Sequence, residues 1–414
     1  MKVKFYTLGC KVNQYETKAL MEDLAGYGFT LTQGKADLYV INTCTVTAKA
    51  DAKSRGMIRR AKKENPSAKI AVSGCLAQLN REYIKKTGAD YIIPQDSKHQ
   101  LADIVAADFG LNVSQKESDR WSMSINGFFN QRAFIKVQDG CDNFCSFCKV
   151  PHVRGRSISR PAHAAIAEIE RLTRQHKEIV LTGINLALYG KDLQPRVSLA
   201  GLVQSVLGLK DLGRLRLSSL EPAMINAELV RLFSQPKLCP HVHLPFQSGD
   251  DAILAAMNKK ATGALYLDAV SRFRQAVPQI AVSCDVMVGF PGEDESAFRN
   301  TIAFLKKVRP MRVHIFTFSG REGTRYQGWQ PKDPRTAAQR SQALKRLCTD
   351  FSRQYERDSC GKTLTMVTEE FVNGWTSGYT ENYLRVSVNR RLPLGELIPV
   401  RLIGTKDRKL AAEV

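Results

Sequence analysis

Three cysteines within eight residues constrain this chain most strongly: Cys141, Cys145 and Cys148, spaced C-x3-C-x2-C. An odd number of thiols this close cannot form a disulfide framework, so metal binding is the natural interpretation. Sulfur ligands alone favour zinc or an iron–sulfur cluster. A structural zinc site needs further ligands at finger-like spacing, but the next cysteine is Cys239 and His152 stands alone. Three thiolates on a four-iron cluster leave one iron open, and catalytic metal sites keep such an open position.

A second set of cysteines follows three strand-like segments in the first quarter of the chain. Cys10, Cys44 and Cys75 are separated by 34 and 31 residues. Each separation matches one β-α-β unit of about 30 residues. Because ligands of parallel sheets bind beyond the carboxyl ends of the strands, one topology would bring all three thiols to the same edge. The pattern predicts a second three-thiol cluster site, and the alternative is three buried cysteines packed as small apolar residues.

Strands and helices alternate over residues 1–110, which predicts a doubly wound α/β domain with a parallel sheet. The expected strands are Lys4–Leu8, Asp37–Ile41, Lys69–Val72 and Tyr91–Ile93, and the expected helices are Tyr15–Tyr27 and Ala48–Lys63. Residues 111–128 are polar over 114–119 and lack periodicity, so we interpret them as a linker.

Residues 129–357 repeat the strand–helix alternation and predict a β/α barrel, complete or partial. The expected strands are Ala133–Val137, Ile179–Thr182, Arg214–Ser218, Val242–Phe246, Ala281–Val288 and Val313–Phe318. The Cys141 loop follows the first strand, where barrel enzymes carry their chemistry. Polar and glycine residues follow four of the other strands, at 182–185, 218–222, 247–249 and 289–293. Glycine lets a backbone approach a ligand closely, so these segments predict a ligand-binding edge.

Residues 358–414 predict a small antiparallel β-barrel. The expected strands are Leu364–Thr368, Leu384–Val388 and Ile398–Ile403, with turns at Asn373-Gly374 and Ser377-Gly378. Four aromatic side chains in this region could stack on unpaired bases or pack the core: Phe371, Trp375, Tyr379 and Tyr383. The remaining cysteines have no metal spacing and are interpreted as structural thiols: Cys239, Cys284, Cys348 and Cys360.

The formal net charge of +21 indicates a polyanionic partner, with nucleic acid as the first candidate and a generally basic surface as the alternative. Basic residues concentrate on the predicted helix Ala48–Lys63 and at Arg154, Arg156 and Arg160. No apolar run approaches the length of a membrane span, and the amino terminus has no signal-peptide pattern. We therefore expect a cytoplasmic protein without a membrane partner, in which clustered cysteines bind metal.

The chain resembles the radical S-adenosylmethionine methylthiotransferase family over nearly its whole length. The C-x3-C-x2-C loop resembles the superfamily signature, and its flanks Gln138–Gly140, Arg154–Arg156 and Ser159-Arg160 narrow the match to that family. Gly9–Thr17 and Asn42–Thr47 are similar to the family's amino-terminal domain. The segment Gly378–Val386 resembles its carboxyl-terminal RNA-binding barrel, called TRAM.

The resemblance implies an enzyme with two [4Fe-4S] clusters that uses S-adenosyl-L-methionine. One cluster, on Cys141, Cys145 and Cys148, would generate a 5′-deoxyadenosyl radical, and an auxiliary cluster on the first triplet would handle the inserted sulfur. The resemblance assigns S-adenosylmethionine contacts to Gly183, Ser219, Glu221, Gln247 and Gly289. It names no catalytic residue beyond the cluster ligands.

The sequence of Gly9–Thr17 favours the subfamily that adds a methylthio group to C2 of N6-threonylcarbamoyladenosine at tRNA position 37. The implied partners are tRNA, not DNA, and an electron donor such as flavodoxin or ferredoxin. Three alternatives stay open: an enzyme for isopentenyladenosine tRNA, an enzyme for an aspartate of a ribosomal protein, and a zinc-containing RNA-binding protein without activity.

Overall fold

The computed structural model describes residues 1–113, 119–331, 333–406 and 409–414, and it divides into two compact units. The first unit comprises residues 1–126, 139–160 and 321–328, and the second comprises residues 127–138, 161–320 and 329–414. The loop with the C-x3-C-x2-C motif therefore belongs to the first unit, together with the amino-terminal domain. The polar run 114–118 of the predicted linker lies outside the described residues.

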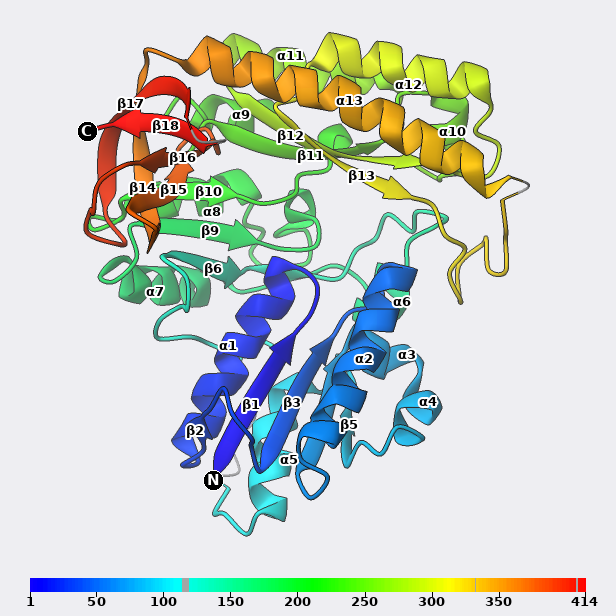
Figure 1. Ribbon diagram of the computed structural model, residues 1–414, viewed down its shortest axis with the longest axis vertical. Coiled ribbons are helices and arrows are strands. Elements are labelled where there is room, and N and C mark those ends of the chain that lie inside the picture. Colours follow the sequence, from blue (N-terminus) through cyan, green and yellow to red (C-terminus); the bar gives the residue numbers. More distant parts are fainter. Residues whose placement is uncertain (114–118, 332, 407–408) are drawn as a thin grey trace. The chain divides into compact units, whose positions relative to one another are not determined.

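The first unit is built on a parallel sheet in the order β2-β1-β3-β4-β5 (Figure 1). Its strands are β1 (Lys2–Thr7), β2 (Thr30–Leu31), β3 (Leu38–Thr43), β4 (Lys69–Gly74) and β5 (Tyr91–Ile93). Its helices are α1 (Lys11–Gly26), α2 (Ala48–Glu64), α3 (Cys75–Leu79), α4 (Arg81–Lys85) and α5 (Leu101–Asp108), with a 3-10 turn at Lys98–Gln100. The predicted doubly wound sheet is confirmed, although α1 begins four residues earlier than expected, directly after Cys10.

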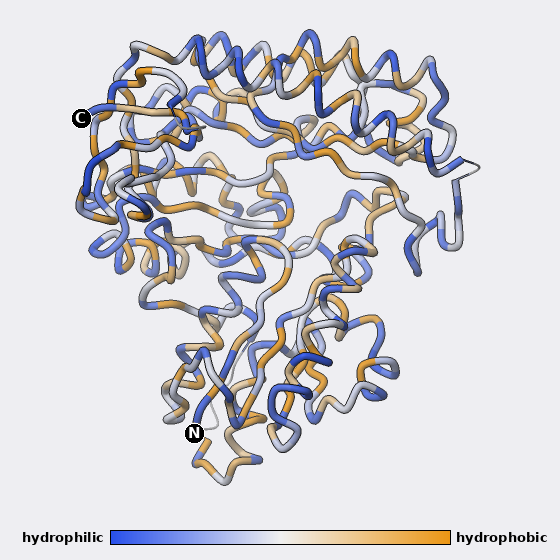
Figure 2. Tube along the Cα trace, viewed as in Figure 1, coloured by the Kyte–Doolittle hydropathy of each residue, from blue (hydrophilic) through white to orange (hydrophobic). Residues whose placement is uncertain are grey.

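All six residues of β3 are buried, which explains its apolar run Leu-Tyr-Val-Ile (Figure 2). Asn42 and Thr43, at the end of the strand, are buried as well. The helix α2 begins after Thr47, whose side chain accepts a hydrogen bond from the amide of Ala50 and caps the helix. It ends at Asn65-Pro66, because proline cannot continue a helix. The first unit also holds β8 (Ile158–Ser159) and α6 (Val150–Arg154) beside the cysteine loop.

The second unit contains two parallel three-stranded sheets, ordered β10-β9-β6 and β11-β12-β13. Their strands are β6 (Arg132–Lys136), β9 (Glu178–Thr182), β10 (Arg214–Leu217), β11 (His241–Gln247), β12 (Ala281–Val288) and β13 (Arg312–Thr317). Two bridges, Leu215 to Leu238 and Ser219 to His243, connect the sheets. Six strands in this order form the predicted partial barrel.

Helices cover the outer side of this partial barrel, and α11, α12 and α13 lie along β11, β12 and β13 (Figure 1). The helices are α7 (Ala162–Thr173), α8 (Leu199–Leu207), α9 (Ala227–Leu232), α10 (Asp251–Ala256), α11 (Gly263–Ala276), α12 (Glu295–Val308) and α13 (Pro334–Ser359). Short 3-10 turns lie at Leu186–Leu188 and Pro222–Met224, and β7 (Gln138–Asp139) follows β6. Among the described residues, no helix is long and apolar enough to cross a membrane.

The carboxyl-terminal strands close into a five-stranded barrel in the order β14-β15-β16-β18-β17. They are β14 (Thr363–Val372), β15 (Trp375–Thr380), β16 (Arg385–Val388), β17 (Leu397–Lys406) and β18 (Lys409–Glu413). The barrel is antiparallel as predicted except between β16 and β18, which pair in parallel. The predicted turn at Asn373-Gly374 is confirmed, and both residues have positive φ.

The predicted turn at Ser377-Gly378 is wrong, because these residues lie inside β15. A Cβ atom at Gly378 would lie 1.8 Å from the carbonyl oxygen of Val367 on the neighbouring strand. Glycine is required here by close approach of two strands, which sequence alone cannot distinguish from a turn.

A buried charge cluster joins this small barrel to the strands of the partial barrel. Arg214 and Arg216 donate to the carboxylate of Glu178, with nitrogen–oxygen distances of 2.6 and 2.7 Å. Their other nitrogens donate to backbone carbonyls of Thr365, Tyr379, Thr380 and Glu381. Burial alone would raise the pKa of the Glu178 carboxyl, but the two guanidinium groups outweigh it and lower the pKa. The small barrel is thereby held to the partial barrel by charged groups whose nitrogens and oxygens are hydrogen-bonded to both.

Candidate functional site

The parallel sheet of the first unit brings three of the predicted ligand residues to one edge. Cys10 lies three residues after β1, whereas Cys44 and Cys75 directly follow β3 and β4. These strands are neighbours and parallel, so their carboxyl ends lie together. The strand order 2-1-3-4-5 reverses direction between β1 and β3, where doubly wound sheets bind their ligands.

Two glycines let the backbone pass close to these thiols. Gly9 has a φ of +100°, and a Cβ atom there would lie 3.1 Å from the sulfur of Cys44. Gly74 has a φ of +95°, and a Cβ atom would lie 2.4 Å from the carbonyl oxygen of Thr43. Any larger residue would be strained in conformation and would collide with its surroundings. The glycines therefore fix the tight turns that carry Cys10 and Cys75.

The thiols of Cys44 and Cys75 are buried, whereas Cys10 is exposed. Burial raises the pKa of Cys44 to about 11, and the neighbouring thiols of Cys75 and Cys10 add to the rise. Burial also raises the pKa of Cys75, against the opposing positive charge of Arg154. A group of thiols that repel one another once ionised needs a bound cation to hold all of them as thiolates. This donor set fits a soft, sulfur-binding metal centre.

The loop with Cys141, Cys145 and Cys148 lies in the same unit, and all three thiols are partly exposed. The amide of Cys141 donates to the carbonyl oxygen of Gly155 at 3.1 Å, and the amide of Cys148 to that of Cys145 at 2.9 Å. Gly140 has a φ of +68°, and a Cβ atom there would lie 1.9 Å from the carbonyl oxygen of Arg156. The loop is therefore folded by its own backbone into a compact turn whose sulfurs stay accessible.

A buried ionic network, which the sequence did not predict, joins this loop to α1. The guanidinium of Arg154 donates to Glu16 at 3.1 Å and to Asp139 at 2.8 Å, and it also contacts the side-chain oxygen of Asn13. Glu16 also accepts from Lys98, which donates to Asn42 at 3.0 Å. Arg154 is 4% exposed and Glu16 is fully buried. The network places a fixed positive charge beside Cys75.

This finding corrects the interpretation of the basic run after the cysteine loop. Arg154 and Arg160 are buried, and only Arg156 is exposed, with its guanidinium 4.8 Å from the ring of Phe144. Arg160 donates to the hydroxyl of Tyr15 at 3.2 Å. Two of the three arginines therefore bind internal partners and cannot contact an RNA backbone.

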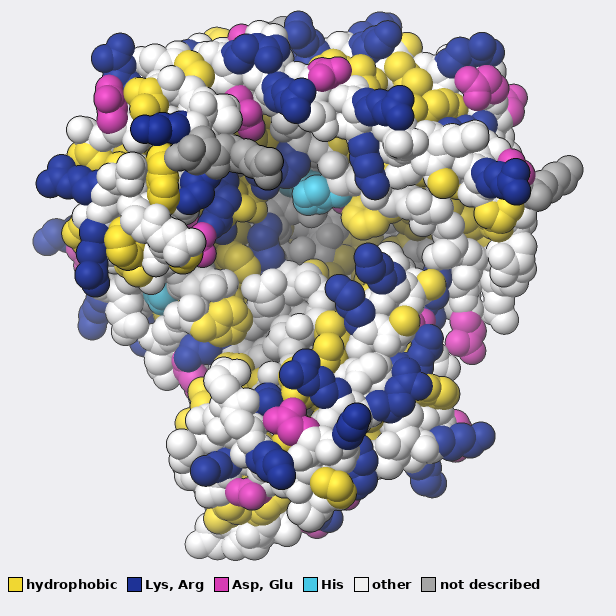
Figure 3. All heavy atoms as spheres, in the orientation of Figure 1, with side chains coloured by type: hydrophobic (Ala, Val, Ile, Leu, Met, Phe, Trp, Pro, Cys, Tyr) yellow, Lys and Arg dark blue, Asp and Glu magenta, His cyan; other side chains and the backbone are white. Residues whose placement is uncertain are grey.

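The helix α2, in contrast, carries its basic residues on the surface (Figure 3). Its exposed cationic side chains are Lys49, Lys53, Arg59, Arg60 and Lys63. The opposite face of the helix is buried at Ile58 and Ala61. The helix thus separates an apolar core face from a cationic outer face.

In the second unit, the residues predicted to contact S-adenosylmethionine lie at the carboxyl ends of four strands. Gly183 follows β9, Ser219 follows β10, Gln247 ends β11 and Gly289 follows β12. Gln247 and Gly289 have φ angles of +70° and +73°. All four face the same end of the partial barrel because its strands are parallel.

Glu221, the fifth predicted contact, is 6% exposed and has protein partners of its own. Its carboxylate forms an ion pair with Lys259 and accepts from the hydroxyl of Tyr266 at 3.4 Å. Sequence reasoning missed Lys259, which lies 38 residues away along the chain. The pair makes Glu221 a fixed anion beside the strand ends.

Comparisons with known proteins identify relatives of this chain. Residues 2–93 match the uncharacterized protein family UPF0004, and residues 135–305 match the Radical SAM superfamily. The chain is 35% identical to the threonylcarbamoyladenosine tRNA methylthiotransferase MtaB of Thermotoga maritima, over 92% of this chain and 90% of that protein. The MtaB protein of Bacillus subtilis is 33% identical, over 97% of this chain and 93% of that protein. The tRNA-2-methylthio-N(6)-dimethylallyladenosine synthase of Syntrophotalea carbinolica is also 33% identical, over 96% of this chain and 95% of that protein.

Solved structures of radical enzymes share the fold. The radical S-adenosylmethionine methyltransferase TsrM of Kitasatospora setae superposes with a TM-score of 0.58 at 14% identity, over 76% of this chain and 74% of that chain. The cobalamin-dependent enzyme OxsB superposes with a TM-score of 0.54 at 10% identity, over 84% of this chain and 56% of that chain. The solved structures show the fold, whereas the sequence matches over nearly the full length show the family. The chain belongs to the radical S-adenosylmethionine methylthiotransferase family of enzymes.

Proposed function

We propose that this enzyme transfers a methylthio group to C2 of N6-threonylcarbamoyladenosine at position 37 of tRNA. The observation that carries the proposal is the pair of cysteine triplets at strand and loop ends, in a chain that matches MtaB relatives over nearly its full length. A structural zinc site is closed by four ligands, whereas each of the two predicted cysteine sets has three. A cytoplasmic location follows from a tRNA substrate.

The residues fit two iron–sulfur clusters. Cys141, Cys145 and Cys148 would hold one cluster, and Cys10, Cys44 and Cys75 the auxiliary cluster. When bound, a four-iron cluster with an open iron supplies the electron that cleaves S-adenosylmethionine, and an external protein such as flavodoxin or ferredoxin would deliver that electron. The chain's own contribution is positional: Arg154 fixes the cysteine loop against α1 and places positive charge near Cys75. S-adenosylmethionine would lie along Gly183, Ser219, Glu221, Gln247 and Gly289.

Expression of this protein in a bacterial strain that lacks its own tRNA methylthiotransferases should restore the 2-methylthio derivative of threonylcarbamoyladenosine. Mass spectrometry of nucleosides from total tRNA measures the product, and a Cys148→Ala variant is the inactive control. Restoration of the 2-methylthio derivative of dimethylallyladenosine alone would instead assign the chain to the second group of relatives. Absence of both derivatives would contradict the proposal.

Charge reversal on α2 should weaken tRNA binding and make it less dependent on salt. Each phosphate contact contributes roughly 0.7 to 0.9 to the slope of log affinity against log salt. An Arg59→Glu/Arg60→Glu variant should therefore lower the slope by about 1 to 2, measured by fluorescence anisotropy across a salt series. The matched control reverses two adjacent exposed residues on α13, Lys345 and Arg346. Equal slopes for wild type and the α2 variant would show that this helix is only a solvated surface.

A further inference from the structure

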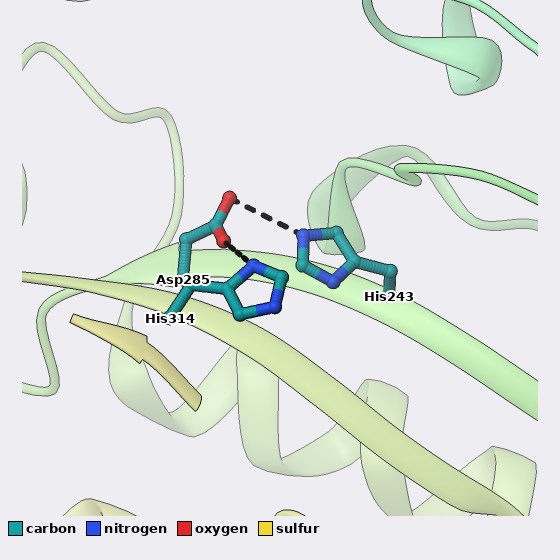
Figure 4. A group of neighbouring side chains, drawn as sticks. All are labelled: His243, Asp285 and His314. Carbon is teal, nitrogen blue, oxygen red and sulfur yellow. Dashed lines mark ion pairs between the residues drawn. The ribbon is translucent and has the colours of Figure 1, made fainter. Parts of the chain in front are cut away.

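Three ionisable side chains that no cluster requires lie together on β11, β12 and β13: His243, Asp285 and His314 (Figure 4). Asp285 lies opposite His314 in the pairing of β12 with β13, and Ser283 lies opposite His243 in the pairing of β11 with β12. Alternate residues of a strand share a face, so Ser283 and Asp285 point to the same side. The other side of β12 carries Cys284, Val286 and Val288, which are buried.

The trio therefore lies on the inner side of the partial barrel, because the helices α11, α12 and α13 cover the apolar side (Figure 1). His243 lies four residues before Gln247 on β11, and Asp285 lies four residues before Gly289. With a rise of about 3.3 Å per residue, the trio is about 13 Å below the strand ends. Deeper still, the ring of His241 stacks on Tyr383 of the small barrel, with centroids 4.5 Å apart. His243, Asp285 and His314 thus form a polar layer between the strand ends and the stacked rings of His241 and Tyr383.

Each carboxylate oxygen of Asp285 is bound by a different imidazole. Nε2 of His243 lies 3.2 Å from Oδ2, and Nδ1 of His314 lies 3.3 Å from Oδ1. The hydroxyl of Ser283 lies 3.0 Å from Nδ1 of His243, which fixes the orientation of that ring. Burial would raise the pKa of the Asp285 carboxyl, but the hydrogen bonds from both histidines outweigh it and hold the pKa well below its ordinary value. The layer therefore contains a fixed anion with two oriented imidazoles.

The layer remains open to a ligand. The side chain of His314 is 52% exposed, that of Asp285 is 20% exposed and that of His243 is 14% exposed. A hydrocarbon group placed here would strip water from an ionised carboxylate without replacing its hydrogen bonds, which is costly. A polar group with both donors and acceptors would replace them. The chemistry of this layer thus selects a polar ligand.

Adenine itself indicates which group would reach this depth. Its N9 and its N6 amino group lie at opposite ends of the purine. A base drawn out of the anticodon loop keeps its ribose and phosphates outside the barrel, so the substituent on N6 enters first. The dimethylallyl group of one class of relatives is a hydrocarbon, whereas threonylcarbamoyl carries a carboxylate, a hydroxyl and a urea N–H.

We propose that His243, Asp285 and His314 form the binding site for the N6-threonylcarbamoyl substituent and select it over a hydrocarbon substituent, an inference that rests on the proposed function. Asp285 accepts hydrogen bonds from the hydroxyl and the urea N–H of the substituent. His314 bridges Asp285, on its Nδ1 side, and the threonyl carboxylate, on its Nε2 side. His243 contacts the substituent least and orients Asp285.

Two histidines and a carboxylate also resemble a divalent-metal site, since one ligand atom from each lies within 4.8 Å of the others. Here each imidazole already directs a nitrogen at its own carboxylate oxygen, and a cation would have to displace both protons. The hydrogen-bonded arrangement favours an organic ligand, and the experiment below includes the metal as an outcome.

The test uses the cluster-loaded enzyme and three anticodon stem-loop RNAs, which carry threonylcarbamoyladenosine, dimethylallyladenosine or adenosine at position 37. His314→Phe and Asp285→Asn keep the shapes of the side chains. Each should reduce kcat/KM for the threonylcarbamoyl RNA by roughly 10- to 150-fold, the range for a lost hydrogen bond to a charged group. Binding of the adenosine RNA should change less than threefold. His163→Phe, at an exposed histidine of α7, is the matched control.

A change on the substrate keeps the proposal testable even if a variant does not fold. An RNA whose threonyl carboxylate is converted to an amide should lose at least tenfold in affinity for the wild type but little further in His314→Phe. Equal affinity of the wild type for both RNAs would overturn the proposal. So would one equivalent of Zn²⁺, measured by equilibrium dialysis, that binds the wild type and is lost in Asp285→Asn. If the wild type modifies the threonylcarbamoyl RNA but both variants retain its preference, only this inference fails. If the wild type modifies only the dimethylallyl RNA, the proposed function fails as well.

Discussion

Arg154→Leu should destabilise the first unit more than any other single substitution near the cysteines, by about 3–5 kcal/mol. Breaking a buried ion pair costs this much, because the remaining charge loses its partner without regaining water. Here Asp139 and Glu16 would each lose the guanidinium that binds their carboxylate, while Lys98 and Gln95 would still donate to Glu16. Thermal denaturation of the cluster-loaded protein measures the effect as a fall in Tm. Arg156→Leu, which removes an exposed arginine two residues along, should leave Tm nearly unchanged.

A second substitution separates lost charge balance from lost packing. Asp139→Asn removes the negative charge that loses its guanidinium partner in Arg154→Leu. The double variant should therefore be more stable than the sum of the two single changes predicts. Strict additivity would show that Arg154 acts through packing of its stem alone. A Tm for Arg154→Leu that equals that of Arg156→Leu would contradict the importance of the network altogether.

The sequence predicted the strands well because their signals are local. Each predicted strand of the first sheet and of the partial barrel lies within two residues of an observed one, and the cysteines at strand ends followed from the spacing of β-α-β units. In the small barrel, β15 was missed because Ser377-Gly378 resembles a turn. Sequence alone could not reveal that the glycine makes room for a neighbouring strand.

The buried ionic contacts could not be predicted, because their partners are distant in the chain. Arg154 meets Glu16 across 138 residues, and Arg321 pairs with Asp51 across 270 residues. In the sequence, Arg154 and Arg160 belong to a basic run that is typical of an RNA-binding surface. His243 and Asp285 looked like ordinary strand residues until β11 and β12 paired. Local sequence gives the charge of a side chain, whereas only the fold decides whether that charge faces water or another ion.

The second large effect concerns the separate roles of the two cysteine triplets in cleaving S-adenosylmethionine and in transferring sulfur. A Cys10→Ala/Cys44→Ala/Cys75→Ala variant should lose methylthio transfer to tRNA but still release 5′-deoxyadenosine from S-adenosylmethionine and a reductant. Its iron content should fall from about eight to about four atoms per chain, the numbers for two four-iron clusters and one. Metal analysis, liquid chromatography of 5′-deoxyadenosine and mass spectrometry of tRNA nucleosides measure the three quantities. Zinc in place of iron would instead support a non-enzymatic RNA-binding protein.

The structure supports survival of the fold in this variant. Cys10 is exposed, and alanine at Cys44 and Cys75 removes one sulfur atom from each site without burying a new charge. Arg154 also holds the cysteine loop through Glu16, Asp139 and Asn13, and alanine at the first triplet leaves these contacts in place. Alanine at Cys141, Cys145 and Cys148 should abolish both products, and Cys360→Ala, at an exposed thiol far along the chain, should affect neither. A first-triplet variant that methylthiolates tRNA at the normal rate would contradict this division, because the sulfur would then have to reach C2 without the site that the sheet edge forms.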